Sequence, residues 1–469
     1  MKVLLMMADA QMHKFYLGSH VRSAREAPIS TSTLAALTQD RPDIEYTLID
    51  ESVDKVPLDF PADLVGISVL TGTARRAYAL ADHFRSRGIP VVLGGAHVTL
   101  LPDEARQFAD SIVIGMAEKT WPQLLADFEA GLLLPEYREP PSDSPWAEGI
   151  PTPRWDLTRL SGYMVPHVVH ATRGCVHSCD FCSVRGIWKR FQRRPVADVV
   201  ADIRAIPAKR FVLNDVSPFD DIEYAKELVA AIIPLRKKWG GLATTRITDD
   251  PELFDLLQKS GCNYLLIGFE SANQSALNRI AKGFNKSTDY KTLMCKMREA
   301  RIIVQGCFVF GFDHDTTDVF GATVQEVQDL KIDIPRYSLY TPYPGTPLFK
   351  RLEAEGRVLS YDWSDYDTMK VVFRPNQMSP AELFEGFRWA YQQTFTLRNI
   401  LERTIGAGKN FPIAFMGNLT YRLFVKRLQR SRGFEMPLPV RTVPASRQLA
   451  PPRVACPPTP PPHDTTAAS

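Results

Sequence analysis

The stretch Arg173-Gly174-Cys175-Val176-His177-Ser178-Cys179-Asp180-Phe181-Cys182 decides how the rest of the chain is interpreted. Three of the seven cysteines fall within it, shortly after the apolar run from Tyr163 to Val169. Closely spaced thiolates are soft ligands that select zinc or iron–sulfur clusters. Three cysteine ligands on a four-iron cluster leave one iron open to a substrate or cofactor. The loop therefore predicts an iron–sulfur cluster at Cys175, Cys179 and Cys182.

Two other interpretations of this loop remain open from the residues alone. One is a closed zinc site formed by the three cysteines and His177, because three cysteines and a histidine are a common structural zinc set. However, His177 stands between the first two cysteines, and a short loop has difficulty turning all three side chains inward. The other is three ordinary buried cysteines, but such clustering after a strand is rare by chance. The cysteines at 262, 295 and 307 lie in apolar surroundings and are interpreted as core residues.

Downstream of the loop, strand-like runs alternate with helical segments. The runs are Phe211 to Leu213, Leu242 to Thr244, Tyr264 to Ile267, Ile302 to Phe310 and Tyr337 to Tyr340. Units of about 30 residues with polar or glycine-containing strand ends are typical of a full or partial TIM-like barrel, whose chemistry lies where the strands end. We expect this barrel over residues 163–356.

Upstream of the loop, residues 1–134 also alternate between strands and helices. The strand-like runs are Val3 to Met7, Tyr46 to Ile49, Leu64 to Val69, Val91 to Leu93 and Ser111 to Ile114. This regular alternation of strands and helices predicts an α/β domain with a doubly wound, Rossmann-like parallel sheet. Such a sheet binds ligands beyond the carboxyl ends of its strands. The loops at 71–73, 94–97 and 115–118 follow three of these strands, so they either converge on one ligand or serve only as tight turns. No GxGxxG follows the first strand, which disfavours a dinucleotide.

The remaining segments flank these two domains. Residues 135–162 are rich in proline and are interpreted as a linker. We interpret residues 357–432 as a helical domain that covers the barrel as a cap. Within it, Ser379 is the expected N-cap residue of an amphipathic helix that begins at Pro380. Between 421 and 432 five basic residues and no acid alternate with apolar ones, which predicts either a solvated helix face or contact with an anionic membrane. We expect the proline-rich tail, 433–469, to be disordered.

Composition sets outer limits on function. A chain of 469 residues with 45% hydrophobic side chains is long enough for two or three domains. Its formal net charge of +3 gives no argument for a nucleic-acid partner. The apolar start is too short for a signal peptide, and no run approaches the roughly 18 residues of a membrane span. An odd, clustered set of cysteines favours a reduced, cytoplasmic setting.

The pattern Cys-x-x-x-Cys-x-aromatic-Cys resembles the defining loop of the radical S-adenosylmethionine (SAM) superfamily. The resemblance implies that Cys175, Cys179 and Cys182 bind a [4Fe–4S] cluster whose open iron takes the amino and carboxylate groups of SAM. Reductive cleavage then yields a 5′-deoxyadenosyl radical, with electrons from a donor such as flavodoxin or ferredoxin. The SAM contacts implied by similar motifs are Phe181, Asn214, Asp215, Glu270, Ser271 and Gly306. Related sequences more often have two acids where this chain has Asn214-Asp215.

The strand-end loops of the first domain, together with Tyr340 to Pro347, resemble the superfamily branch that carries an N-terminal cobalamin-binding domain. The cobalamin contacts implied by this resemblance are Ser68, Thr71, Gly94, Gly95, His97, Gly115 and Glu118. The DxHxxG signature, which supplies a histidine to cobalt in other cobalamin proteins, is absent from this sequence. Cobalamin is therefore expected to bind without a histidine ligand, or not at all, and His97 has no clear case as a cobalt ligand.

This resemblance predicts a cobalamin-dependent radical SAM methyltransferase that acts on an unactivated carbon in a biosynthetic pathway. A radical SAM enzyme that rearranges, cyclises or oxidises its substrate is the first alternative. A non-catalytic, zinc-bearing binding protein is the second. The expected substrate is a small molecule, and the basic apolar stretch near the C-terminus hints at a lipid or polycyclic one.

Overall fold

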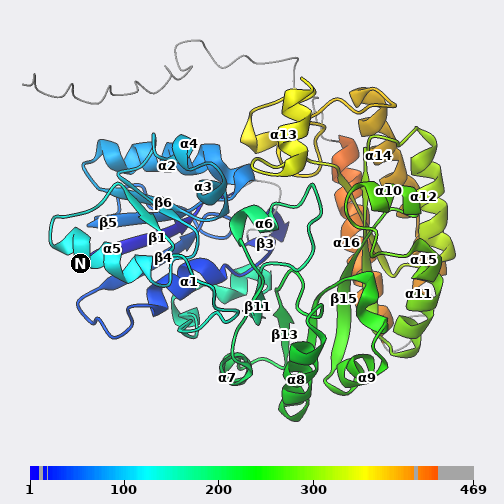
Figure 1. The fold of residues 1–469 in the computed structure, drawn as a ribbon, viewed down its shortest axis with the longest axis horizontal. Coiled ribbons are helices and arrows are strands. Elements are labelled where there is room, and N and C mark those ends of the chain that lie inside the picture. The colour runs from blue at the N-terminus through cyan, green and yellow to red at the C-terminus, as the bar shows by residue number, and fades with distance from the viewer. Residues whose placement is uncertain (10–13, 18–19, 406–409, 431–469) are drawn as a thin grey trace, which may run out of the picture.

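The structure, a computed structural model, describes residues 1–9, 14–17, 20–405 and 410–430. Figure 1 shows two α/β lobes side by side, the N-terminal one in blue and cyan and the second mainly in green, with α13 between them at the top. The expected disordered tail at 433–469 lies outside the described residues. No helix in the described ranges is long and apolar enough to cross a membrane.

The N-terminal lobe is a parallel sheet in the order β4-β1-β5-β6-β7-β8. Its strands are β1 (Lys2–Met7), β4 (Glu45–Asp50), β5 (Leu64–Ser68), β6 (Val91–Gly94), β7 (Ser111–Ile114) and β8 (Glu136–Arg138). The chain adds β4 on one side of β1 and all later strands on the other. The topological switch point, where such sheets bind ligands, therefore lies between β1 and β5.

Helices cover both faces of this sheet, as a doubly wound fold requires (Figure 1). They are α1 (Ile29–Ala36), α2 (Ala74–Ser86), α3 (Ala96–Leu100), α4 (Pro102–Ala105) and α5 (Thr120–Glu129). On one face, buried side chains of α2 pack with Val65, Ile67 and Leu93. On the other face, Trp121 and Leu125 of α5 pack with Ala35 of α1. The predicted Rossmann-like architecture is thus confirmed.

The second lobe is a six-stranded parallel sheet in which spatial order follows chain order. Its strands are β10 (Val168–Val169), β13 (Arg210–Leu213), β14 (Lys238–Ala243), β15 (Cys262–Glu270), β16 (Ile303–Phe310) and β17 (Ile334–Leu339). Its connecting helices are α7 (Val196–Ala205), α8 (Ile222–Ile232), α9 (Pro251–Lys259), α10 (Gln274–Arg279), α11 (Tyr290–Glu299) and α12 (Asp318–Asp329). The first and last strands do not pair, so the sheet is a partial barrel with all strand ends on one rim.

The segment interpreted as a linker also supplies structure. Residues 136–138 form β8 of the first sheet, two residues beyond the predicted domain end at 134. The run from Tyr163 to Val169 is divided between two sheets: β9 (Tyr163–Val165) joins β2 (Lys14–Leu17) and β3 (His20–Glu26), whereas β10 begins the barrel. The two lobes are therefore connected by strand pairing as well as by the chain.

The C-terminal region consists of α13 (Pro347–Ala354), α14 (Pro380–Thr394), α15 (Leu397–Thr404) and α16 (Phe411–Arg430). Ser379 and Glu382 form a reciprocal capping box at the start of α14, with hydrogen bonds of 3.2 and 2.7 Å, which confirms the predicted N-cap. In α16, Tyr421, Phe424 and Val425 pack against the barrel core. In the described part of the basic stretch, Phe424 and Val425 thus pack on the protein itself, whereas Leu423 is exposed.

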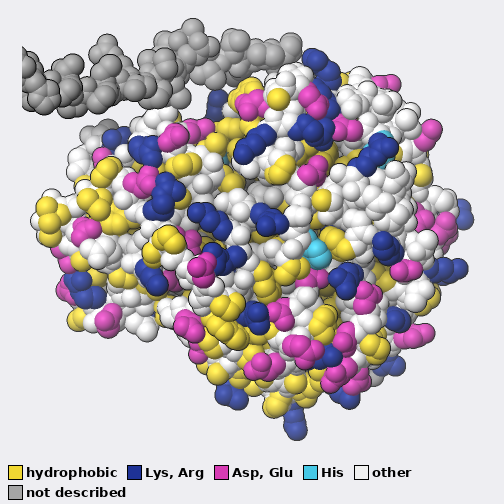
Figure 2. All heavy atoms as spheres, in the orientation of Figure 1, with side chains coloured by type: hydrophobic (Ala, Val, Ile, Leu, Met, Phe, Trp, Pro, Cys, Tyr) yellow, Lys and Arg dark blue, Asp and Glu magenta, His cyan; other side chains and the backbone are white. Residues whose placement is uncertain are grey.

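The region after residue 356 was predicted to be a helical cap, and in the structure it contacts both lobes. Trp363 and Tyr366 join the hydrophobic cluster on the α2 face of the first sheet. The indole nitrogen of Trp363 donates to both carboxylate oxygens of Glu104 at 2.9 Å. Over the visible face of the molecule, acidic and basic side chains are interspersed (Figure 2).

Candidate active site

The cysteine loop begins from a short hairpin that a buried carboxylate fixes. The hairpin pairs β11 (Thr172–Arg173) with β12 (Gln192–Arg193). Asp215, just after β13, accepts hydrogen bonds from the amide of Ala171 at 2.9 Å, the hydroxyl of Thr172 at 2.8 Å and the amide of Thr172. Burial raises the pKa of Asp215 to about 6 despite these donors. Its carboxylate thus anchors the approach to Cys175.

Gly174 makes the turn from the hairpin into the loop. Its φ of +78° lies in the left-handed region that favours glycine. A Cβ at this position would also collide with the carbonyl oxygen of Arg190. The glycine beside the first cysteine is therefore required by both backbone angle and space.

The far end of the loop is fixed to the last strand of the barrel. The hydroxyl of Tyr340, one residue after β17, donates to both carboxylate oxygens of Asp180 at 2.9 Å. The amide of Leu348 in α13 donates to the backbone oxygen of Asp180 at 3.1 Å. Phe181 packs edge-to-face on the Tyr340 ring, with centroids 5.8 Å apart. The loop therefore spans the barrel rim from the first strand to the last.

A second segment, residues 281–285, lies against the cysteines. The thiol of Cys179 is 3.9 Å from the carbonyl oxygen of Ala281. His177 stacks on Phe284 with ring centroids 3.7 Å apart, and its Nε2 lies 3.3 Å from a carboxylate oxygen of Asp220. The imidazole of His177 is thus held by partners other than the cysteines, which disfavours the closed zinc site.

The same segment places a positive charge beside the thiols. The ammonium of Lys282 lies 2.5 Å from a carboxylate oxygen of Glu270, and both side chains are about nine-tenths buried. Burial alone would lower the pKa of Lys282, but Glu270 and the thiol of Cys179 raise it. Glu270 itself has φ +63°, an uncommon backbone conformation for a non-glycine residue and one that clusters at functional sites.

The chemistry of the donor set fits an iron–sulfur cluster. Three thiols are carried on one loop, which is fixed at both ends and leaves the cysteine side chains only partly buried. Burial raises the pKa of Cys179 to about 12 and also raises that of Cys182. Because iron binds thiolates, cluster assembly on these residues releases protons. Cys175, Cys179 and Cys182 would hold the cluster.

The residues predicted to contact SAM surround this loop, but several already have protein partners. Asn214 and Asp215 follow β13, Glu270 ends β15 and Ser271 follows it. Asp215 is bound to the hairpin and Glu270 to Lys282, as described above. At Gly306 in β16, a side chain would meet Ile332 and Phe269 at 2.8 and 3.3 Å, within the core. The assignment of these residues to SAM stays a prediction.

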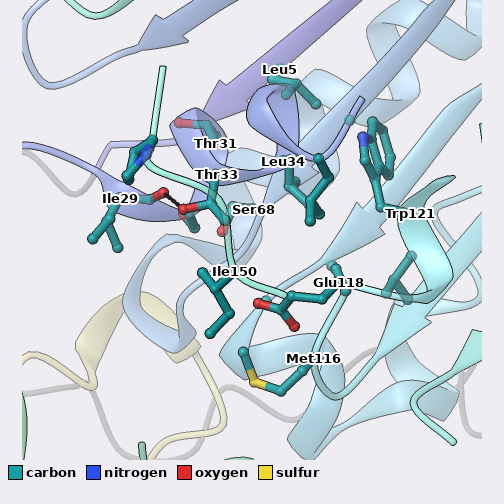
Figure 3. A pocket seen from close by; sticks show the side chains of 18 of the residues that line it. Leu5, Ile29, Thr31, Thr33, Leu34, Ser68, Met116, Glu118, Trp121 and Ile150 are labelled. Carbon is teal, nitrogen blue, oxygen red and sulfur yellow. Dashed lines mark hydrogen bonds between the residues drawn. The ribbon is translucent and has the colours of Figure 1, made fainter. Parts of the chain in front are cut away.

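A cavity opens at the switch point of the first sheet (Figure 3). Arg173 of the cysteine hairpin also lines it. It holds about 1140 Å³ of space not filled by atoms, part of it open to solvent. Five of the seven predicted cobalamin contacts line it: Ser68, Gly94, Gly95, Gly115 and Glu118. One end lies between the sheet and the helices, where Figure 3 shows Leu5, Leu34 and Trp121. Met116, Glu118 and Ile150 lie at the other end (Figure 3).

The other two predicted cobalamin contacts, Thr71 and His97, do not line this cavity. His97 is fully buried, and its Nε2 lies 3.1 Å from the hydroxyl of Tyr78 while its Nδ1 lies 3.4 Å from Thr71. Its ring also contacts Trp363 edge-on, with centroids 5.7 Å apart. His97 therefore packs on the α2 side of the sheet, opposite the cavity.

The barrel lobe contributes another part of the cavity wall. His170, Arg173, Trp188 and Arg194 line it from residues immediately around the cysteine loop. Burial, and then the charges of Arg173 and Arg194, lower the pKa of His170 to about 4. The imidazole is thus neutral at pH 7. Sequence reasoning missed all four residues, because their role depends on how the lobes meet.

The cavity fits a flat cofactor with an apolar extension. Gly66, in the middle of β5, keeps the inner end open: a Cβ there would lie 2.7 Å from Leu5 and 3.4 Å from Trp121. Gly95 at the mouth has φ +97° and no room for a side chain, because a Cβ there would lie 2.9 Å from the backbone nitrogen of Val69. The apolar inner end and the glycine-lined mouth are suited to cobalamin, which the residues named here would hold.

Together, a cobalamin-type domain and a six-stranded partial barrel with a three-cysteine loop define a radical SAM enzyme with two cofactor sites. Comparison with known proteins supports this class. The family model described as "Radical SAM superfamily" matches residues 169–326, and the model described as "B12 binding domain" matches residues 21–125. A third, "Domain of unknown function (DUF4070)", matches residues 346–414.

Two relatives from Chlorobaculum tepidum are similar over most of their length. Bacteriochlorophyllide d C-12(1)-methyltransferase is 30% identical over 419 residues, covering 86% of this chain and 89% of the relative. Bacteriochlorophyllide d C-8(2)-methyltransferase is 30% identical over 405 residues, covering 80% and 87%. A further relative, the anaerobic magnesium-protoporphyrin IX monomethyl ester cyclase of Cereibacter sphaeroides, is 28% identical over 343 residues, covering 65% of this chain and 55% of the relative.

A solved structure confirms the fold. The radical SAM methyltransferase TsrM from Kitasatospora setae, with cobalamin and a [4Fe–4S] cluster bound, matches with a TM-score of 0.65 at 15% identity, covering 92% of this chain and all of that one. The chain therefore belongs to the radical SAM superfamily, in the branch with a cobalamin-binding domain. It is a methyltransferase-like enzyme whose cofactors are SAM, a [4Fe–4S] cluster and cobalamin. The non-catalytic zinc protein is excluded by this membership.

Proposed function

We propose that this enzyme transfers a methyl group from SAM to an unactivated carbon of a small polycyclic substrate. The observation that carries the proposal is the shared wall between the two cofactor sites. Arg173 stands two residues before the first cluster cysteine and Trp188 six residues after the last, and both line the cavity of the cobalamin-binding domain. When bound, the cluster supplies the electron that cleaves SAM, and cobalamin carries the methyl group.

The chain's own residues support this chemistry by positioning. Asp215 and Tyr340 fix the two ends of the cysteine loop, so the three thiols approach the cluster in a set geometry. The buried Lys282–Glu270 pair places an ammonium next to Cys179, where it offsets the negative charge of the thiolates. The apolar inner end of the cavity excludes water from the cofactor held there. A reduced flavodoxin or ferredoxin is the proposed electron source.

The proposed substrate class is a tetrapyrrole. The two relatives with the longest matches described above are named for methylation of bacteriochlorophyllide d, which is a tetrapyrrole. The cyclase relative favours one alternative, oxidation or cyclisation of a similar substrate without methyl transfer. Methyl transfer and oxidation or cyclisation would both use the cysteine loop, but they form different products from SAM.

Product analysis separates these alternatives. The reconstituted enzyme is incubated anaerobically with hydroxocobalamin, a reductant, methyl-deuterated SAM and bacteriochlorophyllide d. Methylation yields S-adenosylhomocysteine, 5′-deoxyadenosine and a product that carries the label. An enzyme that does not methylate forms 5′-deoxyadenosine without S-adenosylhomocysteine, and that result would overturn the proposal. Cys179→Ala should abolish both SAM products. The control Cys295→Ala should retain them, because Cys295 in α11 is exposed and not a core residue as the sequence predicted.

A further inference from the structure

The loop after β7, residues 115–118, touches the cysteine loop on both sides. The carboxylate of Glu118 forms an ion pair with the guanidinium of Arg173, ahead of the first cysteine. The indole nitrogen of Trp188, beyond the last cysteine, donates to the sulfur of Met116 at 3.0 Å. The loop from the cobalamin domain is thus attached to the polypeptide on either side of the cluster site.

The ion pair is well shielded from solvent. The side chain of Arg173 is 12% exposed and that of Glu118 is 17% exposed. Removing one member of such a pair leaves an uncompensated charge, so the two side chains constrain each other far more than a surface pair does. Loop 115–118 is also fixed from behind, because the amide of Met116 donates to Glu139 at 3.0 Å.

The same four side chains line the cofactor cavity. Met116 and Glu118 come from the sheet lobe, and Arg173 and Trp188 come from the barrel lobe. A cofactor seated in this cavity therefore contacts the two points that attach loop 115–118 to the cysteine loop. A cofactor that orders loop 115–118 therefore also favours the ordered cysteine loop. In turn, a cluster that orders the cysteine loop favours the arrangement of loop 115–118 that contacts the cofactor.

We propose that Glu118 and Arg173 are positioning residues that couple cobalamin binding to assembly of the iron–sulfur cluster. In this role the Glu118 carboxylate acts through Arg173 on the loop that carries Cys175. Cobalamin binds more tightly when the cluster is in place, and by linkage the cluster loop is held more firmly when cobalamin is bound. The proposal rests on the cofactor assignment above and extends it to a thermodynamic link between the two sites.

The coupling is measured as the dissociation constant of hydroxocobalamin without the cluster divided by the dissociation constant with the cluster. Hydroxocobalamin is titrated into the full-length chain, once with the reconstituted cluster and once without it, under anaerobic conditions. Coupling energies between sites typically correspond to a change of about 5- to 150-fold in affinity, so the wild-type ratio should exceed about 5. In Glu118→Gln and Arg173→Gln the ratio should fall towards 1. The double variant should be no worse than either single variant, because both changes remove the same interaction.

A matched control breaks an ion pair elsewhere in the same lobe. Arg41→Gln removes the exposed pair with Glu129 and should leave the ratio at its wild-type value. Arg173→Lys keeps the charge and should restore part of the coupling. A second readout is the paramagnetic resonance spectrum of the reduced cluster, which should change on cobalamin addition in the wild type and not in Glu118→Gln.

Four results would contradict the proposal, and they separate the coupling from the cofactor assignment. A ratio near 1 in the wild type, an undiminished ratio in Glu118→Gln, or single-variant effects that add in the double variant would each overturn the coupling while leaving the cofactor assignment intact. A wild-type chain that binds no hydroxocobalamin in either state would overturn both.

Discussion

Replacing Asp215 with alanine should loosen the start of the cysteine loop and lower cluster loading. The Oδ1 atom of Asp215 accepts three hydrogen bonds at the start of the cysteine loop: two from the amides of Ala171 and Thr172 and one from the Thr172 hydroxyl. The amide of Ala171 also donates to Oδ2 at 3.1 Å. Each buried amide left without an acceptor costs about 1–3 kcal/mol, so losing two costs about 2–6 kcal/mol. Local opening of the hairpin should become at least about 30-fold more frequent, since about 1.4 kcal/mol corresponds to a factor of ten.

Asparagine is the matched variant at this position. Its carbonyl oxygen can replace Oδ1 and accept the same three hydrogen bonds, and only the 3.1 Å bond from the Ala171 amide to Oδ2 is lost. Asp215→Asn should therefore retain both the hairpin and the cluster. The asparagine also removes the pH-dependent free-energy cost of burying an ionised carboxylate at this position. The folded state raises the pKa of Asp215 from 3.8 to about 6, so it binds the proton more tightly than the unfolded chain does. Stability therefore falls by about 3 kcal/mol as pH rises from 3.8 to 6, and Asp215→Asn should lack this fall.

Hydrogen exchange over residues 168–182, together with iron content per chain, measures these effects. Asp215→Ala should exchange faster and hold less iron, and Asp215→Asn should match the wild type in both. Unchanged exchange and full iron loading in Asp215→Ala would refute this role. If the carboxylate instead contacts SAM, both variants should weaken SAM binding equally while keeping the cluster.

Three more changes test other parts of the site. Tyr340→Phe removes the hydroxyl that donates to Asp180, a loss of about 1.5–3 kcal/mol for a bond to a charged group, and should speed release of iron to a chelator. Gly94→Val inserts a side chain beside the cavity and should weaken hydroxocobalamin binding at least about 10-fold, as measured by titration. His170 has a folded pKa of about 4, below its ordinary 6.5, so the unfolded chain binds its proton more readily. Stability should therefore fall by up to about 3 kcal/mol as pH drops from 6.5 to 4, and urea midpoints should show a flatter pH dependence in His170→Gln.

Matched controls accompany these variants. Tyr361→Phe removes an exposed hydroxyl and should leave iron release unchanged. Gly321→Val, at a glycine of α12 with open space around it, should leave cobalamin affinity unchanged. Iron release from Tyr340→Phe at the wild-type rate, wild-type affinity in Gly94→Val, or an unaltered pH dependence in His170→Gln would contradict the corresponding argument.

The fold could be predicted because both lobes are built from local, periodic units. Apolar runs that end in glycine or polar residues mark parallel strands, and the carboxyl ends of such strands meet at one edge whatever the sequence between them. The positions of Gly94, Gly95 and Gly115 around one cavity follow from this rule. The spacing of Cys175, Cys179 and Cys182 likewise predicted a metal or cluster site, and the resemblance to the radical SAM superfamily favoured the cluster over zinc.

The partners of individual side chains could not be predicted, because they depend on contacts between distant segments. His97 follows a strand end as the cavity residues do, but it turns towards Trp363, far along the chain. The pairs Glu118–Arg173 and Glu270–Lys282 have no local sequence pattern. The lysine is buried only because residues 281–285 fold back over the cysteine loop.

The most direct test of the two-cofactor account is quantitative paramagnetic resonance on the anaerobically reconstituted chain. The account predicts one reduced four-iron cluster and one cob(II)alamin per chain, with the cluster signal lost in Cys179→Ala and the cobalamin signal weakened in Gly94→Val. A chain that assembles the cluster but takes up no cobalamin, or that binds cobalamin equally well after Gly94→Val, would contradict the placement of the second cofactor in the switch-point cavity.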